Sequence, residues 1–161
     1  MNETKQKIIE LIPNLRRYAR ALMKDKEEAD DLVQDTLVRA LNKLNLWERE
    51  SNLRAWIFTI MHNIFINKIK KKQRSGMHYD ITNFADQLYH PDSNNGVLEL
   101  NDCIRSLTAL PPSQREVILL ITLEGLSYSE TSMILGIPIG TVMSRLSRAR
   151  KHLIISMKGN R

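Results

Sequence analysis

Apolar side chains recur every three or four residues along most of the chain, which is the spacing of amphipathic α-helices. In the N-terminal half this pattern forms three runs, at residues 11–22, 29–44 and 53–70. We expect these runs to pack together as a compact domain of three or four helices. Pro13 stands inside the first run, and we expect it to separate a short leading helix from the next one.

The helical spacing is lost after the third run. Residues 76–97 gather Asn, Asp, Pro and Gly instead, a composition typical of a connecting segment. We therefore divide the chain into a domain at residues 1–75, an irregular linker at 76–101 and a second domain at 102–161. Strand patterns are absent, so the predicted fold class is all-α, with two small helical domains joined by the linker.

The second domain contains a Ser-x-x-Glu capping signal directly after a pair of prolines. In such a capping box the serine and the glutamate satisfy free amide groups at the start of a helix. Ser113 and Glu116 have this spacing, and we expect them to open a helix over residues 117–123.

The pattern that follows predicts a helix-turn-helix. Ser127 and Glu130 have the spacing of another capping box, and Gly136 is placed to end the helix that they open. Pro138 cannot continue a helix but can stand at the start of one, so the next helix should begin near residue 139. Two short helices joined by so tight a turn cross steeply, as in DNA-binding proteins.

The second of these helices has one apolar face and one polar, basic face. Val142, Leu146 and Ala149 have inward spacing. The outward face is suited to the major groove of DNA, and its candidate DNA-binding residues are Thr141, Ser144, Arg145, Arg148 and Lys151.

Charge is distributed unevenly along the 161 residues. The net charge is +6 overall, made up of +6 in residues 1–75, −4 in 76–101 and +4 in 102–161. Two basic blocks that flank an acidic spacer indicate two modules that face nucleic acid.

Acidic residues cluster near the start of the second N-terminal run, at Glu27, Glu28, Asp30, Asp31 and Asp35, with Gln34 among them. The helix dipole favours acids at a helix start and accounts for two or three of the five. The other acidic residues of this cluster would repel the phosphate groups of a nucleic acid. We interpret them as a docking face for a basic protein partner.

The run at 53–70 has a second, polar face besides its apolar stripe. Amides offer donors and acceptors to base edges, and lysines attract phosphates, so this face suits nucleic acid. A solvated helix surface with a basic C-terminal end is the alternative. Trp47, in the loop before this helix, could anchor the loop, stack on an unpaired base or contact a protein. The polar face comprises Thr59, His62, Asn63, Asn67 and Lys70, followed by Lys71, Lys72 and Arg74.

Residue types needed for catalysis or metal binding do not occur at useful spacings. The four histidines and Cys103 make no zinc motif, and there is no glycine-rich phosphate loop or nucleophile elbow. We expect no enzyme activity, no metal and no cofactor. The single cysteine, the lack of a membrane-spanning run and the lack of a signal peptide predict a cytoplasmic protein without membrane contact.

Taken together, these motifs resemble the extracytoplasmic-function (ECF) group of bacterial sigma-70 factors over almost the whole chain. Residues 30–41, DDLVQDTLVRAL, are similar to region 2.2, and residues 53–67, LRAWIFTIMHNIFIN, to regions 2.3 and 2.4. Residues 110–117, LPPSQREV, and 125–151 resemble region 4. The run at 11–22, LIPNLRRYARAL, brings the chain nearest to the EcfG-type general-stress sigma factors.

The resemblance implies a role for each face. Asp31, Gln34 and Asp35 would dock on the β′ clamp helices of core RNA polymerase. The N-terminal domain would capture an unstacked base of the −10 element, and residues 140–151 would recognise the −35 element of promoter DNA while the other side of that domain rests on the polymerase β-flap. Residues implied at the −10 element are Trp47, Asn63, Asn67, Lys70, Lys71, Lys72 and Arg74.

The resemblance also implies how the protein is regulated, and the sequence departs from the family pattern at one position. EcfG-type factors are held inactive by a NepR-type anti-sigma protein and are released by a PhyR-type regulator that mimics them. The chain should therefore be a monomer or a 1:1 complex with such a protein. Met143 stands where many relatives have a basic or polar residue, which puts one DNA contact in doubt.

Two other functions remain open at this point. A stand-alone helix-turn-helix regulator would bind duplex DNA, usually as a dimer. A sigma-mimicking decoy would bind the anti-sigma protein without contacting DNA.

Overall fold

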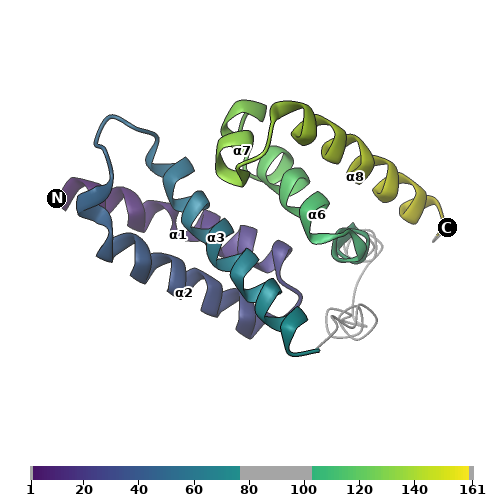
Figure 1. Ribbon diagram of the computed structural model, residues 1–161, viewed down its shortest axis with the longest axis horizontal. Helices are drawn as coiled ribbons and strands as arrows, with labels where there is room; N and C mark the ends of the chain where they lie inside the picture. The colour runs from purple at the N-terminus through teal and green to yellow at the C-terminus, as the bar shows by residue number, and fades with distance from the viewer. Residues whose placement is uncertain (1, 77–102, 160–161) are drawn as a thin grey trace, which may run out of the picture.

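The computed structural model describes residues 2–76 and 103–159. Every regular element in these two ranges is helical (Figure 1). The predicted all-α fold class is confirmed. The linker predicted at 76–101 falls almost entirely outside the described residues.

The N-terminal half forms three helices that pack side by side (Figure 1). They are α1 (Asn2–Leu22), α2 (Lys26–Asn42) and α3 (Leu53–Arg74), and the one-turn 3-10 helix η1 (Leu44–Leu46) follows α2. Their shared core includes an edge-to-face ring pair, Tyr18 and Phe58, whose centroids are 5.1 Å apart. Burial raises the pKa of the Tyr18 hydroxyl well above its ordinary value, with further contributions from the charges of Glu116 and Glu124.

Pro13 does not divide the first helix, contrary to the sequence expectation. It lies inside the continuous helix α1. Pro13 is exposed, whereas Ile8 and Leu15 on either side of it are buried in the core. Packing of this apolar face outweighs the hydrogen bond that a proline removes.

The C-terminal half forms a second helical unit. A helical segment at residues 103–109 leads to α6 (Pro112–Ile118), the π-helical turn η2 (Leu119–Leu123), α7 (Tyr128–Leu135) and the long α8 (Ile139–Gly159). Val117, Leu120, Val142 and Leu146 are among the residues of its core.

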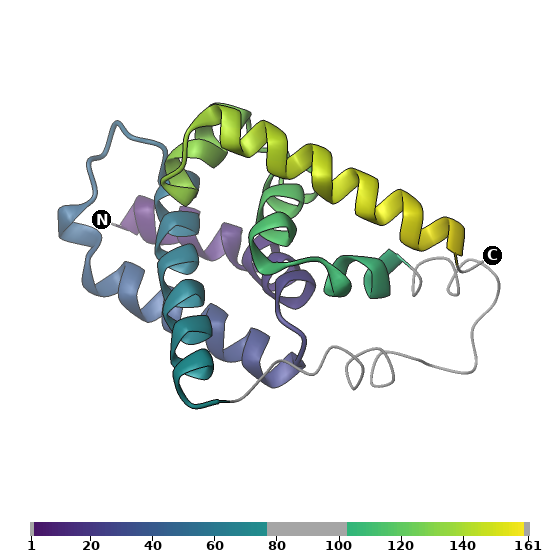
Figure 2. The ribbon, with the colours of Figure 1, turned by 45° about the vertical axis from the view of Figure 1, so that its right-hand side comes forward.

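The two units lie directly against each other (Figure 2). Helix α7 packs on α3, while η2 and α6 contact α1. The core of buried apolar residues is continuous between them. This close association places side chains of the C-terminal domain over the helices α1 and α3.

Candidate nucleic-acid interface

The helix-turn-helix has the geometry that its sequence predicts. The Ser127 side chain accepts a hydrogen bond from the Glu130 amide, and the Glu130 carboxylate accepts one from the Ser127 amide, so the capping box is complete. Gly136 ends α7 at φ 64°, in the left-handed region that glycine adopts without strain. Helix α8 begins at Ile139, and its inward residues Val142, Leu146 and Ala149 are buried, as predicted.

The polar face of α8 is open to solvent over most of its length. Ser144, Arg148 and Lys151 are exposed, and Thr141 is half-buried. Arg145, expected to point outward, is also half-buried, and its charge acts on the buried carboxylate of Glu116. Met143 is exposed, so its apolar side chain is available on this face.

The polar face of α3 is divided between solvent and the other domain. The side chains of Asn63, Asn67, Lys70, Lys71 and Arg74 are exposed. Lys72 instead forms an ion pair with Glu28 of α2, and His62 faces the C-terminal domain. The structure therefore keeps two amides and three basic residues of the predicted nucleic-acid face together on one open surface.

The loop that leads into α3 is held by its tryptophan. The rings of Trp47 and Trp56 have centroids 6.4 Å apart, and both side chains are half-buried. Among the described residues, Trp47 Nε1 is buried without a hydrogen-bond partner. Of the roles that the sequence left open, this geometry favours an anchor for the loop.

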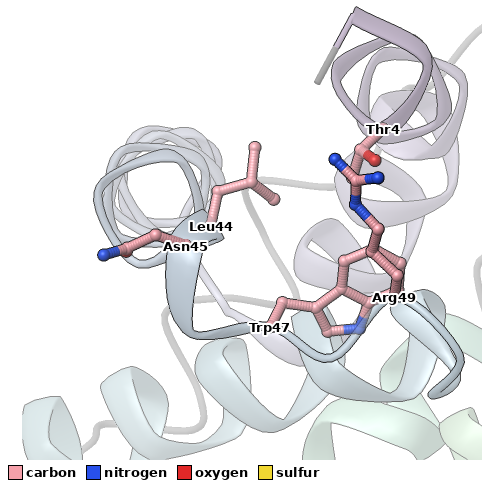
Figure 3. A pocket seen from close by; sticks show the side chains of 5 residues that line it. All are labelled: Thr4, Leu44, Asn45, Trp47 and Arg49. Atoms are coloured by element: carbon pink, nitrogen blue, oxygen red, sulfur yellow. The ribbon is translucent and has the colours of Figure 1, made fainter.

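A hollow of about 180 Å³ lies between this loop and α1 (Figure 3). Thr4, Leu44, Trp47 and Arg49 face one another across it, while Asn45 points away (Figure 3). An indole edge, an aliphatic side chain and a guanidinium are groups that can hold the flat ring of an unpaired base.

Some of the acidic side chains of α2 are engaged in contacts within the domain, and others are exposed to solvent. Asp25 caps the helix by accepting a hydrogen bond from the Glu27 amide. Asp31 and Gln34 are exposed. Asp35 is exposed as well, but its carboxylate lies 3.2 Å from Lys68 Nζ of α3, so part of its charge is balanced within the domain.

A polar seam between the two domains is the feature that sequence reasoning missed. Glu116 of α6 pairs with His62 of α3, and Glu130 accepts a hydrogen bond of 2.7 Å from Asn52 Nδ2 at the start of α3. Between these pairs, the Glu124 carboxylate is bound by Arg17 and Arg54. The N-terminal domain contributes the donors and the C-terminal domain contributes the acids.

Ser113 and Glu116 were predicted to cap a helix over residues 117–123. This prediction is wrong, because α6 begins at Pro112 and both residues lie inside it. Helix α6 has no side-chain cap, because its N-cap residue is Pro111, whose side chain has no hydrogen-bond acceptor. The Glu116 side chain is buried instead. Burial raises its pKa, whereas the hydrogen bond and the charge of His62 lower it, and the charges of Arg145 and Arg115 lower it further.

Arg115 is a second buried charge that the sequence did not single out. Its guanidinium donates to the backbone carbonyls of Leu107, Thr108 and Leu110 at 2.7–3.1 Å and to Leu22 O at 2.8 Å. The contact with Leu22 crosses from the C-terminal domain to the end of α1. Arg115 thus joins three segments by satisfying carbonyls that their helix ends leave free.

The described ranges hold neither a candidate metal site nor a candidate membrane span. No group of three or more His, Cys, Asp or Glu side chains at residues 2–76 and 103–159 is arranged to hold a metal ion. Within the same ranges, no helix is both long and apolar enough to cross a membrane.

Comparisons with known proteins match both halves of the chain. Residues 8–62 match the family model for the Sigma2 domain of PhyR, and residues 101–153 match that for sigma-70 region 4. The ECF RNA polymerase sigma factor EcfG of Rhodopseudomonas palustris is 37% identical over 146 residues, which cover 91% of this chain and 80% of the relative.

Two solved structures share this architecture. The sigma factor RpoE of Bartonella quintana, solved in complex with the anti-sigma factor NepR, is 37% identical with a TM-score of 0.81, and all of both chains is covered. CnrH, solved with the cytosolic domain of CnrY, is 26% identical with a TM-score of 0.71, over 98% of this chain and 89% of CnrH.

Proposed function

The chain belongs to the ECF group of RNA polymerase sigma factors, and we propose that within it the protein serves as an EcfG-type sigma factor of the general stress response. It binds core RNA polymerase and directs initiation at specific promoters. The match to EcfG over most of both chains carries this conclusion, since it includes both promoter-facing domains.

We assign a separate function to each of the three predicted segments. Residues 1–75 dock on polymerase and open the −10 element, residues 76–101 connect the domains, and residues 102–161 recognise the −35 element. The opposite charges of α2 and α3 support the two roles of the first domain, because an acidic face suits a basic protein and a basic face suits DNA.

Docking on polymerase is assigned to the open part of α2. Asp31 and Gln34 are exposed on one side of the helix, and Asp35 can exchange its partner Lys68 for a basic residue of the β′ clamp helices. Such an exchange costs little, since an exposed ion pair contributes on the order of 0–1 kcal/mol.

Capture of a −10 base is assigned to the loop before α3 and to the helix that follows. The hollow beside Trp47 provides the apolar contact, and the exposed amides of Asn63 and Asn67 provide donors and acceptors. Lys70, Lys71 and Arg74 extend the basic surface along α3. Lys72 would first have to leave Glu28.

Recognition of the −35 element is assigned to α8 in the major groove. Ser144, Arg148 and Lys151 are exposed for contact, and Thr141 and Arg145 stand at the edge of the same face. Helix α8 starts at Ile139 directly after the turn, and its first two turns expose Met143 and Ser144. The other side of this domain is left for the polymerase β-flap.

Regulation by a NepR-type anti-sigma protein is the next part of the proposal. Its support is the likeness to RpoE, which was solved with NepR and shares 37% identity with this chain. The factor would then exist as a monomer or as a 1:1 complex in the cytoplasm, where RNA polymerase is found. It works by binding and has no catalytic step, metal or cofactor of its own.

A sigma-mimicking decoy is the second candidate, because residues 8–62 match the Sigma2 domain of PhyR. A decoy has no use for a basic recognition helix. The exposed Arg148 and Lys151 on α8 therefore favour a protein that contacts DNA. A stand-alone regulator fits less well, since it needs no acidic docking face.

In vitro transcription tests the proposal. Core polymerase from the host, the purified protein and genomic promoter fragments should give run-off transcripts that polymerase alone does not give. Addition of the host's small anti-sigma protein should abolish them. If the transcripts are the same with and without the protein, it is not a sigma factor; if it only relieves inhibition by the anti-sigma protein, it is a decoy.

A further inference from the structure

Two arginines of the N-terminal domain converge on one carboxylate of the C-terminal domain. Arg17 Nη2 lies 3.3 and 3.2 Å from the two carboxylate oxygens of Glu124, and Arg54 Nη2 lies 3.0 Å from Oε2. Arg54 also donates to the backbone carbonyl of Glu124. The Glu124 side chain has no exposed surface, whereas 52% of the Arg17 side chain is exposed.

These arginines form an anion site whose present occupant comes from the other domain. Without Glu124, two guanidinium groups would face the same space with no carboxylate bonded to them, and such a pair binds an oxyanion strongly. Arg54 stands in the first turn of α3, where the helix dipole also favours negative charge. Arg54 Cζ also lies over the Phe58 ring, 5.9 Å from its centroid, in a cation–π contact.

The guanidinium of Arg54 has one donor that Glu124 does not use. Arg54 Nε is buried and has no hydrogen-bond partner within the described parts of the chain. A carboxylate offers two oxygens, but a phosphate group offers more acceptors around a tetrahedral centre. The site thus suits a phosphate at least as well as the carboxylate that it holds.

We propose that Arg17 and Arg54 form a binding site for a backbone phosphate of opened promoter DNA, and that Glu124 occupies this site while the two domains are closed on each other. The inference rests on the proposed sigma function. The position favours DNA over an acidic protein, because Arg54 comes directly after the loop at residues 45–52, whose Trp47 and Arg49 line the hollow proposed for a −10 base. Glu124 is thus an internal competitor of the promoter strand.

Two variants that break the same contact distinguish a phosphate site from simple opening of the domains. Glu124→Gln keeps the size of the side chain and leaves both arginines in place. The double variant Arg17→Ala with Arg54→Ala removes the site and leaves Glu124. Both should loosen the seam, but only the first exposes an intact pair of guanidinium groups.

The probe is fluorescein-labelled oligo(dT) of about 15 nucleotides, long enough to cover a single-strand groove, with binding followed by anisotropy over a salt series. Glu124→Gln should bind it about tenfold more tightly than the natural chain, the gain expected from charge-assisted hydrogen bonds to phosphate. The double variant should bind no more tightly than the natural chain. Circular dichroism melting checks that each variant is folded.

A charge-matched control is available in Glu130→Gln. This variant removes the same charge and weakens a contact between the domains. Glu130 hydrogen-bonds Asn52 and neither arginine, and its charge acts on Arg54 only without a direct bond. It should change oligonucleotide affinity far less than Glu124→Gln. Equal gains for the two glutamine variants, or a gain for the double alanine variant, would overturn the phosphate site.

Two further outcomes are informative. If Glu124→Gln does not fold, Glu124→Ala is used in its place with the same expectation. If an oligoglutamate peptide gains affinity and oligo(dT) does not, the pair binds protein acids and the proposal fails. Because the assay contains no polymerase, a negative run-off experiment would reject the sigma function without deciding this result.

Discussion

His62 Nδ1 in the N-terminal domain lies 2.5 Å from Glu116 Oε2 in the C-terminal domain, and both side chains are largely shielded from water. Asn63, the next residue on α3, is exposed on the proposed −10 surface. The proposed −10 surface and the contacts that close the two domains on each other thus share one helix. A change in this pair is therefore expected to alter both stability and the access of DNA to α3.

The buried carboxyl of Glu116 predicts a particular pH dependence. Burial raises its pKa above the ordinary value of 4.5, with the pair partner His62 acting in the opposite direction. A group whose pKa is higher in the folded state contributes stability that is complete below the unfolded pKa and is lost as the pH rises through the folded pKa. The free energy of unfolding should therefore fall across that window.

Glu116→Gln should remove this fall in the free energy of unfolding with rising pH. The glutamine amide keeps the shape and the hydrogen bond of the side chain but does not titrate. Urea unfolding at a series of pH values measures the difference between the two proteins. The difference isolates Glu116 from other carboxyls such as Glu130, whose pKa is lowered chiefly by the Ser127 amide and which acts in the opposite sense. A constant difference at all pH values would contradict the expectation.

The two serines that the sequence placed in capping boxes should differ in their contribution to stability. Ser127→Ala removes a hydrogen bond to the Glu130 amide and should lower the free energy of unfolding by about 1 kcal/mol. Ser113→Ala is the matched control, since α6 has no side-chain cap, and it should have little effect. Thermal melting of both variants compares them, and equal losses would show that Ser113 caps after all.

Arg115→Met should be one of the most destabilising single substitutions. It leaves the buried carbonyls of Leu22, Thr108 and Leu110 without their donor, and each such group costs on the order of 1–3 kcal/mol. We expect a loss of about 3 kcal/mol or more in urea unfolding. The loss is compared with that of Arg105→Met, which replaces a half-buried arginine of the same domain.

Reversal of charge on α2 tests polymerase docking. Asp31→Lys with Asp35→Lys should weaken binding to core polymerase by repulsion from a basic partner and leave the fold intact, because both side chains are exposed. Glu10→Lys on α1 is an exposed control outside the acidic face. Titration of labelled core polymerase measures the affinities. If the double variant binds core polymerase with full affinity, this face of α2 is not part of the docking surface.

Two substitutions on α8 separate base contacts from phosphate contacts. Arg145→Ala should weaken −35 recognition by about 1–3 kcal/mol and relax specificity if its guanidinium reaches a base edge. Lys151→Ala should weaken binding almost equally on all sequences and reduce the salt slope by about 1. Footprinting on the native and altered −35 sequences, with polymerase present, distinguishes them. A uniform loss for Arg145→Ala would assign it to phosphate.

Local features of the fold were predictable because their causes lie within a few residues. The Ser127 and Glu130 box, the left-handed Gly136 and the start of α8 each depend on backbone amides next to the residues that satisfy them. The prediction for Pro13 was wrong because the core contacts of Ile8 and Leu15 carry the helix through it.

The sequence by itself determined the helical fold class, the helix-turn-helix, the acidic and basic faces and the family, since each of these follows from periodicity, caps or motif order. Only the tertiary structure decided which charges meet. Glu116 had the spacing of a cap but pairs with His62, 54 positions away, and Glu124 binds Arg17 at a separation of 107. Such pairs depend on how the two domains pack, and sequence spacing carries no information on that. Through them, the tertiary contacts decide which polar side chains of α3 are covered by the other domain, as His62 is, and which stay exposed, as Asn63 does.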